Sequence, residues 1–528
     1  MEQRRLLIFV LISIVVIVVY TEALRRIYGR PQLASERSRP PEVERSVPPP
    51  EAPPQPSSGL AVPASDEAAV VVDTDMLHVA ITPVGARLVA VQLKGYRRSV
   101  TADSDLLDLV QPGPVLPATL QMGPQTSDAD LPYHPDRTEL VLRGGERGEI
   151  TFSADSTSGL HIEKHYRFSG EGYLFDVSVA IAGEHGPSSV GLVMTPLPAE
   201  MPSSKVQTAV ALANRRLVEK HLPDLLKQPA SVESSAWAGF AEQYFMTVAV
   251  TPEGTLPAVF TASDGTPIVR LDAGLVEGRA GFSLYAGPKE RNVLAHAGHD
   301  LDRALDFGMF WFIAIPLLYA LHLLQTATGN YGVAIIVLTA MVKVVTAPLT
   351  RTTFRNMREM QKIQPQMVKL RERFKDDQAA LQKEMMELYR RHRVNPFSGC
   401  LPMLLQLPIF VGLYNALSHA IELRHAPFAL WINDLSAPDR LMIPSIPSAT
   451  PLIGGGVPVL TLLMGASMFL QQWLTPQQGD PAQQRMMMFM PLLFTFMFMN
   501  FPAGLVLYWL VNNVLTIGQQ YLMMRSAK

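Results

Sequence analysis

The hydrophobic and polar positions of this chain divide it into regions of different character. Near the N-terminus, charged residues precede an apolar run at 6–20. Short apolar runs, several of them alternating with polar residues, follow between 65 and about 290. From 307 onward the apolar runs approach the length of about 20 residues that a membrane helix needs. The pattern predicts a membrane anchor, a β-rich domain and a group of membrane helices, in that order.

The first apolar run is predicted to be a retained membrane anchor, at residues 1–22. Its sequence, LLIFVLISIVVIVVY, follows Arg4 and Arg5, which favour a cytoplasmic N-terminus. A cleaved signal peptide is the alternative, but no small-residue cleavage site follows the run. Residues 23–64 then form a linker, because ten of the residues in 31–63 are proline and such a segment buries too little apolar area to fold.

Residues 65–290 are predicted to form an all-β domain. Short runs alternate apolar with polar residues, as half-buried strands do, and Gly and Pro separate them. Examples are VVVDT, ARLVAVQL, TELVLR, GLHIEKHYRF, YLFDVSVAIAG, YFMTVAV and LPAVFTA. Regular short strands of this kind favour a large β-sandwich. We expect one helical patch, near 208–222.

The C-terminal part contains apolar runs at 309–324, 331–349, 401–421, 457–474, 486–501 and 503–523. The first has only 16 residues, and a helix of about 24 Å is shorter than a hydrocarbon core of about 30 Å. The block from Arg351 to Arg393 holds 12 Lys or Arg and 6 Asp or Glu, and such charge collects in cytoplasmic loops. If 309–324 crossed the membrane, this block would lie outside. We therefore predict an interfacial amphipathic helix within a connecting region, 291–330, with Trp311 and Tyr319 at headgroup level.

Six spans remain, at 6–22, 331–350, 400–421, 457–474, 486–501 and 503–523. This arrangement puts both termini in the cytoplasm and the β domain in the periplasm of a two-membrane bacterium. Within the core, 331–528, the segment 351–397 is predicted to be a cytoplasmic helical hairpin, with Pro365 bending or interrupting its first helix. Its cationic surface suits RNA or anionic lipid headgroups.

Composition narrows the function classes. Charged residues make up 17% of the 528-residue chain, against about 25% in soluble proteins, and a net charge of −2 argues against a general nucleic-acid binder. The single cysteine, Cys400, excludes an internal disulfide and a cysteine-rich zinc site. The sequence has no Gly-Lys pair for a Walker A loop and no HExxH motif. We expect no catalytic residues, no metal and no cofactor.

Lys343 carries the sharpest functional signal. It lies in the run NYGVAIIVLTAMVKVVTAPLT with Thr339 one turn before it, and a cation there costs at least about 2.5 kcal/mol. Either the long side chain reaches the inner headgroups, or it lies in a water-filled pocket open to the cytoplasm. Other polar residues in the predicted spans pair between helices or line the same pocket. They are Gln406, Asn415, Asn512, Asn513, Gln519 and Gln520.

Several stretches between 301 and 525 resemble the YidC/Oxa/Alb family of membrane-protein insertases in order and spacing. They are DFGMFWFIAIPL, GNYGVAIIVLTAMVK, TAPLT, KIQPQMVKLRERFKDD, EMMELYRRHRVNPFSGCLPMLLQLPIF, ELRHAPFALWINDLS and FPAGLVLYWLVNNVLTIGQQ. The anchor, the Pro-rich spacer and the β domain resemble the form found in Gram-negative bacteria.

The resemblance implies an α-helical polytopic membrane protein of six transmembrane helices plus a large periplasmic all-β supersandwich domain. Its five-helix core would enclose a hydrophilic groove, open to the cytoplasm and to lipid. The groove cation, commonly arginine in the family, is Lys343 in this chain. Matching positions make Thr339, Gln406, Tyr508 and Trp509 groove or substrate-contact residues. Trp509 stands where relatives often have tyrosine.

The implied function is non-enzymatic insertion of hydrophobic segments of nascent proteins into the inner membrane, alone or with the Sec translocon. The implied partners are nascent membrane proteins, the Sec translocon with its accessory components, the ribosome and signal-recognition targeting machinery, and membrane lipids. Two other classes stay open. A secondary transporter with an intramembrane Lys343 site would have paired halves with similar broken helices, which the sequence does not show. An anchored periplasmic carbohydrate protein would need a pair of acid and base carboxylates in a cleft.

Overall fold

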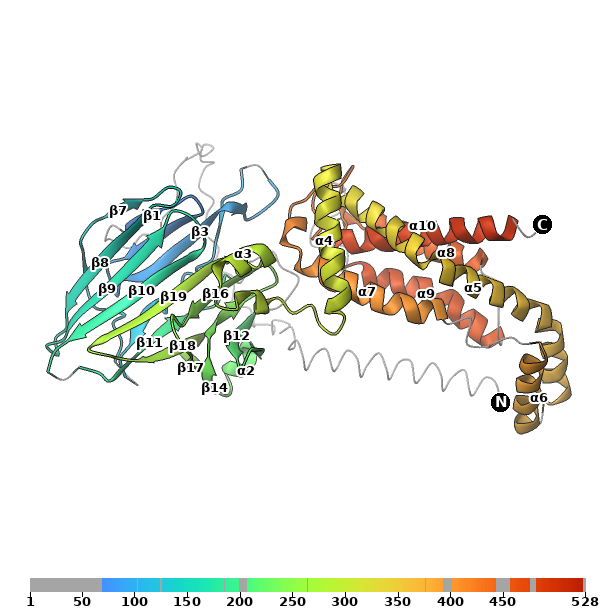
Figure 1. The fold of residues 1–528 in the computed structure, drawn as a ribbon, viewed down its shortest axis with the longest axis horizontal. Helices are drawn as coiled ribbons and strands as arrows, with labels where there is room; N and C mark the ends of the chain where they lie inside the picture. The colour runs from blue at the N-terminus through green and yellow to red at the C-terminus, as the bar shows by residue number, and fades with distance from the viewer. Residues whose placement is uncertain are drawn as a thin grey trace, which may run out of the picture.

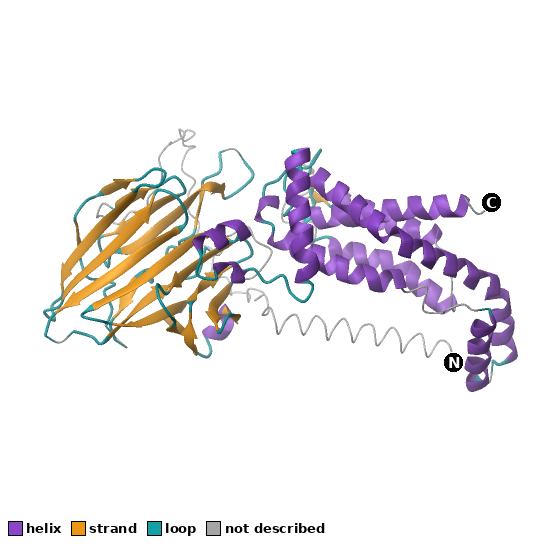
Figure 2. Ribbon diagram, in the orientation of Figure 1, coloured by secondary structure: helices purple, strands orange, loops and turns teal. Residues whose placement is uncertain are grey.

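The computed structural model describes residues 69–525, except 102, 124–125, 185, 199–206, 264, 376, 393–400, 443–455 and 475–480. Within these residues a β domain and a helical bundle lie end to end (Figure 1). Strands occupy one end of the molecule and helices the other (Figure 2). The expected anchor at 1–22, the linker at 23–64 and Cys400 lie outside the described residues.

The β domain contains three sheets, and their strands follow one another in space in this order. The first is β4 (Leu106–Asp108), β3 (Arg87–Arg97), β2 (Leu77–Thr82), β1 (Val70–Asp73) and β7 (Glu139–Val141). The second is β13 (Arg216–His221), β12 (Thr208–Ala213), β15 (Trp237–Ala241), β16 (Phe245–Val250), β19 (Arg279–Pro288), β10 (Leu174–Ala182), β9 (His161–Ser169), β8 (Arg147–Asp155) and β6 (His134–Pro135). The third is β14 (Ala230–Ser235), β17 (Leu256–Ser263), β18 (Thr266–Gly274), β11 (Ser189–Met194) and β5 (Thr119–Gln121).

Alternating burial along the strands explains how these sheets pack. On β9, Ile162, Tyr166 and Phe168 are buried, whereas His161 faces solvent. Phe168 stacks on Phe175 of β10 with ring centroids 4.6 Å apart. The strands β15 and β16 are buried along their whole length, as expected where both faces are covered. The predicted β-sandwich is confirmed.

The prediction of a helical patch near 208–222 is wrong. Strands β12 and β13 form a hairpin there, and its two turn residues, Asn214 and Arg215, have φ of 50° and 61°. A two-residue hairpin turn with positive φ at both positions matches the right-handed twist of the strands, and Asn tolerates that conformation. Only α2 (Leu222–Leu225) is helical. Pairing of β12 with buried β15 outweighs the helix propensity of an Ala-containing segment.

The remaining elements follow β19 along the chain. The helices are α3 (Arg291–Ala297), α4 (Trp311–Thr328), α5 (Tyr331–Arg373), α6 (Gln378–Arg391), α7 (Leu401–His419), α8 (Val459–Leu474), α9 (Pro481–Phe498) and α10 (Ala503–Arg525). Short 3-10 helices are η1 (Leu301–Ala304) and η3 (Ile421–Leu423), and a two-stranded ladder joins β20 (Leu441–Met442) to β21 (Gly456–Val457).

Two segments among the described residues are long and apolar enough to cross a membrane, Trp311–Thr328 and Tyr331–Pro348. Val459–Leu474 and Met487–Phe498 are shorter apolar helices. The helical part therefore has membrane-spanning capacity, while the count of six spans stays a prediction.

Helix α4 lies across the ends of the other bundle helices (Figure 1). It has 18 residues, slightly more than the sequence suggests, and would be about 27 Å long. Ala314, Leu318 and Leu321 are buried, but the opposite side exposes Phe312 and Leu323. Both sides are apolar, so the expected amphipathic pattern is absent, because this helix packs on protein with one side and exposes an apolar surface on the other.

Helix α5 is a single helix of 43 residues that contains both Pro348 and Pro365. The sequence predicted a bend or an interruption at Pro365, and the helix is not interrupted there. Its last turns pack against α6 through buried Met360, Ile363 and Leu388, so tertiary contact compensates for the hydrogen bond that proline removes. The expected hairpin elements are present as the end of α5 and α6.

The β domain is joined to the bundle by direct contacts. Gln243 donates its Nε2 proton to the carbonyl of Ser418, the two atoms lying 2.8 Å apart. Arg424, which follows η3, donates to the Arg97 carbonyl at 2.7 Å and lies 5.5 Å from the ring centroid of Phe245. These contacts join the C-terminal end of α7 and the segment after it to the first and second sheets.

A fully buried ion pair lies inside the β domain. The Lys164 ammonium and an Asp128 carboxylate oxygen are 2.6 Å apart, and neither side chain is exposed. Lys164 also donates to the carbonyls of Gly85 and Ala118, and Tyr133 donates to Asp128. Each charge thus has several partners, which a buried pair requires.

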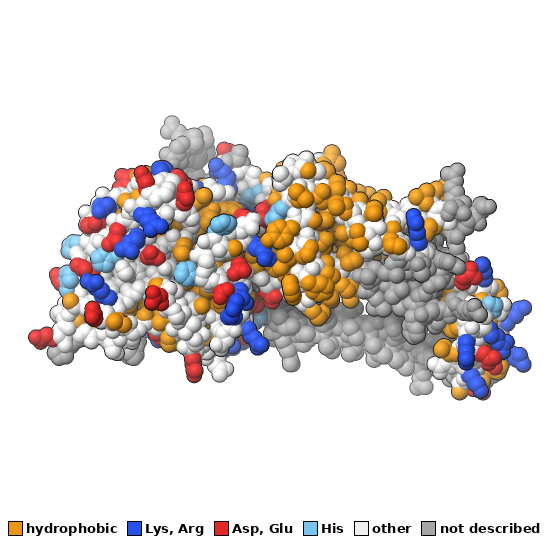
Figure 3. All heavy atoms as spheres, viewed as in Figure 1, with side chains coloured by type: hydrophobic (Ala, Val, Ile, Leu, Met, Phe, Trp, Pro, Cys, Tyr) orange, Lys and Arg blue, Asp and Glu red, His pale blue; other side chains and the backbone are white. Residues whose placement is uncertain are grey.

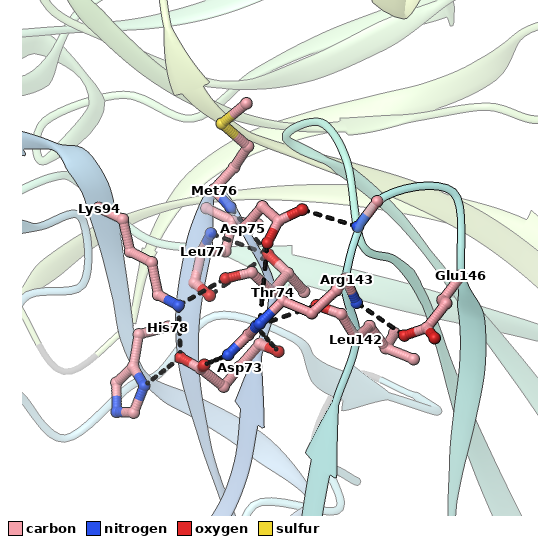
Figure 4. A network of polar contacts seen from close by, with 11 residues as sticks. Asp73, Thr74, Asp75, Met76, Leu77, His78, Lys94, Leu142, Arg143 and Glu146 are labelled. Atoms are coloured by element: carbon pink, nitrogen blue, oxygen red, sulfur yellow. Dashed lines mark hydrogen bonds and ion pairs between the residues drawn. The ribbon is translucent and has the colours of Figure 1, made fainter.

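A second polar network ties β1 to its neighbours (Figure 4). Asp73 pairs with Lys94 and with Arg143, each at 2.7 Å, and lies 3.2 Å from His78 Nδ1. Partial burial raises the pKa of Asp73, but the hydrogen bonds from Lys94, Arg143 and His78 lower it further, to about 2. The network favours the ionised carboxylate.

Removing one member of the buried pair should destabilise the β domain strongly. Lys164→Met leaves Asp128 charged and unpaired, and should lower the free energy of unfolding by about 3–5 kcal/mol. The double variant Lys164→Met/Asp128→Asn, which retains neither charge, should recover a large part of that loss. Pulse proteolysis across a urea titration measures both values. A double variant no more stable than Lys164→Met would contradict this account.

The Asp73 network should make stability depend on pH. Asp73→Asn should cost about 1 kcal/mol at pH 7, because solvent screens a partly exposed site. The folded pKa of about 2 lies below the ordinary value of 3.8, so the stabilisation is present above about pH 4 and disappears as the pH falls through 2. The difference between wild type and variant, measured by urea unfolding, should shrink over this window. Glu253→Gln, in an exposed turn, is the control.

Candidate functional site

The helices α5 and α10 bring the polar residues of the bundle together. Helix α5 begins after Asn330, whose side-chain oxygen accepts the Val333 backbone N–H at 3.1 Å. Lys343 therefore lies about 18 Å along the helix from its start at Tyr331. Helix α10 packs beside α5 and provides the partner of this lysine.

The Lys343 ammonium donates to the Thr516 hydroxyl oxygen at 2.8 Å. Thr516 donates its own proton to the Asn512 carbonyl at 2.6 Å, which leaves its oxygen free to accept from the lysine. Among the described residues, no carboxylate lies within ion-pair distance of Lys343. The site thus holds a partly buried cation with a hydroxyl partner and no counter-charge from the described chain.

Two polar rows flank this contact. Tyr508, Asn512 and Thr516 are four residues apart on α10 and therefore share one face. Thr339 and Lys343 have the same spacing on α5. Thr339 is buried, and its hydroxyl donates to the Ile335 carbonyl of its own helix at 2.6 Å. The rows give the α5–α10 interface a polar track.

Gln406 connects α7 to the same face of α10. Its Nε2 donates to the Tyr508 hydroxyl oxygen, the two atoms lying 2.6 Å apart. Tyr508 is 2% exposed, so this bond lies inside the bundle. The structure therefore brings Gln406 and Tyr508 together, near the N-terminal end of α10.

Trp509 lies in an aromatic cluster rather than beside the lysine. Its ring centroid is 4.7 Å from that of Phe410 on α7 and 5.4 Å from that of Phe498 on α9. Phe494 stacks on the same tryptophan at 6.2 Å. The cluster forms an apolar wall joining α7, α9 and α10.

The structure does not bring Asn415 to Lys343. Its amide donates to the Phe307 carbonyl at 2.7 Å, and so holds the segment that precedes α4. The sequence pattern placed Asn415 with the other polar residues because it lies in the same apolar run as Gln406. Its position near the C-terminal end of α7 instead gives it a structural partner.

Sequence reasoning missed Thr516, the partner of the lysine. The available signal was its spacing of four from Asn512 and eight from Tyr508. The structure also shows that the polar residues of α10, which the sequence analysis treated as one group, face different helices. Asn513 bonds to Ser467 and Gln520 to the Leu474 carbonyl, so both join α10 to α8.

Apolar side chains cover much of the bundle surface around this site. In Figure 3, hydrophobic side chains dominate the visible face over α4 and α5, whereas charges cover the β domain and the α6 hairpin. Exposed apolar side chains on α8 and α9 include Leu462, Leu463, Phe469, Leu470, Trp473, Met487, Met488, Phe489, Met490, Leu492, Leu493, Phe496 and Met497. Such a surface suits lipid or an apolar polypeptide segment.

The chemistry available at the site is charge and hydrogen bonding. Within the described part of the chain, no group of three or more His, Cys, Asp or Glu residues is placed to hold a metal ion. The ammonium of Lys343, the Thr516 hydroxyl and the Gln406–Tyr508 pair can attract and solvate an acidic or polar segment. They form no arrangement of nucleophile and base.

Two protein families match this chain. Residues 69–320 match the family described as YidC periplasmic domain, and residues 323–528 match the family described as 60Kd inner membrane protein. Together these matches cover both parts of the structure.

Individual relatives match over most of their length. A membrane protein insertase YidC from Geobacter sulfurreducens is 42% identical over 415 residues, which are 76% of this chain and 75% of the relative. One from Pelobacter propionicus is 38% identical over 487 residues, 88% of this chain and 89% of the relative. A solved active YidC insertase with its first transmembrane domain resolved is 18% identical and covers 87% of this chain and 93% of its own, with a TM-score of 0.38.

The Gln406–Tyr508 bond should contribute measurably to bundle stability. Tyr508→Phe leaves the half-buried Gln406 amide without its acceptor, and should cost about 1 kcal/mol in unfolding in mixed micelles. Tyr521→Phe, on the exposed side of the same helix, should have little effect. Adding Gln406→Leu to Tyr508→Phe should restore part of the loss. Equal losses for both tyrosine variants would show that the bond is not stabilising.

Proposed function

Because this chain belongs to the YidC family of membrane protein insertases, we propose that its bundle moves hydrophobic segments from the cytoplasm into the inner membrane along a cationic, hydrophilic groove. The observation that carries the proposal is Lys343, a cation within a helix long and apolar enough to span the membrane, with no described carboxylate beside it. An ammonium without a counter-charge leaves its field available to an incoming chain.

The groove wall, in this proposal, is the polar track on α5 and α10. Lys343, Thr339 and Asn512 line it, with Tyr508 and Gln406 towards its outer part and Trp509 at its apolar edge. Asn415 is left out because it bonds to Phe307. Water belongs in such a groove, since the buried side-chain oxygen of Gln519, one turn beyond Thr516, has no protein partner among the described residues.

The groove lowers the cost of moving a polar tail. A tail that carries Asp or Glu is attracted to Lys343, and hydroxyl and amide groups replace part of its hydration. The attached hydrophobic segment slides along α7 and α9 into lipid. Burial of roughly 20 apolar residues supplies the free energy, and the membrane potential assists charged tails. No nucleotide enters this scheme.

Lysine at this position changes the character of the site relative to the arginine common in the family. The ammonium is a compact point charge on a flexible stem, whereas a guanidinium binds a carboxylate through two parallel hydrogen bonds. We propose that Lys343 attracts acidic tails without fixing their orientation. A single hydroxyl partner, Thr516, is compatible with such a loosely held charge.

The proposed topology has six spans, formed by residues 6–22 and by the first part of α5, α7, α8, α9 and α10. Its domains are the anchor 1–22, the linker 23–64, the periplasmic domain 65–290, the connecting region 291–330 and the core 331–528. Both termini then lie in the cytoplasm, and α4 lies on the outer surface. Support comes from the steep angle of α4 to the other helices and from the charged hairpin at the opposite end of α5 (Figures 1 and 3).

The proposed partners follow from where the charges lie. The hairpin 351–397 carries exposed Lys and Arg at the proposed cytoplasmic end, where the ribosome, the signal-recognition machinery and anionic lipids would meet it. The periplasmic domain would face the Sec translocon and its accessory components. Nascent membrane proteins are the clients of the groove itself.

Removing the positive charge of Lys343 should slow insertion of clients with acidic tails more than insertion of clients with neutral tails. In liposomes that contain only the purified chain, Lys343→Ala should slow insertion of a single-span client with an acidic outer tail by about tenfold, the effect of one cation at short range. The same client with a neutral tail should be affected much less. Lys343→Arg should keep most of the activity.

Lys369→Ala, which removes a cation from the exposed hairpin, is the matched control and should insert both clients normally. Equal loss for acidic and neutral tails in Lys343→Ala would refute the electrostatic role. Uptake of a small solute without client insertion would favour the secondary transporter.

A further inference from the structure

The loop from Arg424 to Arg440, which we call the outer cap, covers the ends of several bundle helices. Asn330, at the start of α5, donates its side-chain amide to the Phe428 carbonyl at 3.1 Å. The first backbone N–H groups of α10 are also satisfied by the outer cap. Those of Ala503 and Gly504 donate to the carbonyls of Ala437 and Leu435 at 2.8 and 2.9 Å. The outer cap is therefore part of the helix ends rather than a free loop.

Asp439 makes the contacts that fix the outer cap to α8. One carboxylate oxygen accepts the Trp431 indole N–H at 2.7 Å. The other accepts the backbone N–H groups of Leu460 and Thr461 at 2.5 and 3.3 Å. These are the second and third residues of α8, so a side chain from a distant part of the chain caps this helix.

Arg440 extends the same attachment to α9. Its guanidinium donates to the Met499 carbonyl at 2.8 Å and to the Asn500 side-chain oxygen at 3.0 Å, just after α9 ends. It also donates to the Asp439 carbonyl at 2.8 Å. The two neighbouring residues thus join the outer cap to α8 and α9.

Asp439 is difficult to replace, because its partners are buried. Asp439 is 3% exposed, and Leu460 and Thr461 are 5% and 0% exposed. A helix leaves its first N–H groups unpaired unless a cap or water reaches them. A carboxylate at a helix N-terminus adds a charge-assisted bond and a favourable interaction with the helix dipole. Without Asp439, water must enter the outer end of the bundle to satisfy these groups.

We propose that Asp439 is a positioning residue that locks the outer cap over the helix ends, so that the polar site around Lys343 opens to one side of the membrane only. This role rests on the proposed groove and goes beyond it. A wet, cationic path that reached both surfaces would conduct ions, whereas insertion needs water from the cytoplasmic side alone. The seal then depends on one buried carboxylate far along the chain from the lysine.

Side-specific labelling tests the proposal in the full-length chain. Cys400 is replaced by serine, and Thr339→Cys, one turn from Lys343 towards the outer cap, serves as the probe. A membrane-impermeant maleimide is added to the outside of spheroplasts. Asp439→Ala should raise the labelling rate of Cys at 339 by about tenfold, since loss of a buried charge-assisted bond shifts an opening equilibrium by that order.

A matched control lies in the same loop. The Asp434 carboxylate accepts from the backbone N–H and hydroxyl of Ser436, two residues away, at 2.8 and 2.6 Å, and these bonds stay within the outer cap. Asp434→Ala should leave outside labelling at 339 unchanged. If Asp439→Ala does not accumulate, Asp439→Asn keeps the shape and one acceptor, and should give an intermediate rate.

The possible results separate this proposal from that of the groove. Outside labelling of the Asp439 variants at the rate of Asp434→Ala would overturn the role of Asp439. An equal rise at Ala249→Cys, in the core of the β domain, would indicate general unfolding and would also overturn it. Labelling of Thr339→Cys from the inner face, in inverted vesicles with Asp439 intact, tests the groove separately. Its absence would count against the groove while the outside rate still decides the role of Asp439.

Discussion

A lysine ammonium inside an apolar helix is the constraint on which the rest of the bundle depends. Lys343 is costly to bury, and the described chain offers it one hydroxyl and no carboxylate. In the proposed groove, solvent or a polar segment of a client would complete the hydrogen bonding of this ammonium. The row of Tyr508, Asn512 and Thr516 provides a polar lining on the facing helix. The aromatic cluster around Trp509 keeps the neighbouring wall apolar.

The two ends of the bundle differ in how their polar groups are satisfied. At the outer end, the outer cap, Asp439 and the β domain satisfy helix termini with buried hydrogen bonds. At the other end, α5 leaves the bundle and turns into an exposed, charged hairpin. Buried polar groups thus hold one end together, whereas the polar groups at the other end are largely exposed. In the proposed function, this asymmetry would give the groove a direction.

Local sequence patterns predicted most of the fold. Alternation predicted the strands, and the family resemblance named Lys343, Gln406 and Tyr508, of which the last two are bonded to each other in the structure. The segment 208–222 was mistaken because burial against β15 is a long-range effect that its composition does not contain. For the same reason, Asn415 was grouped with the pocket residues and Asp439 was not singled out. Their partners, Phe307 and the start of α8, are distant in sequence, and only the folded chain shows which carbonyl or N–H each one meets.

The unbroken length of α5 has a mechanical meaning. A helix of 43 residues is a rod of about 64 Å, with its outer end held by Asn330 and its far end in the hairpin. A rod pivoted at one end transmits a push at the other as a tilt. Because Lys343 lies between these two ends, a displacement of the hairpin would swing it sideways by a fraction of that displacement. A force on the hairpin would in this way change the separation of α5 and α10 along the polar track, with α5 acting as the lever arm.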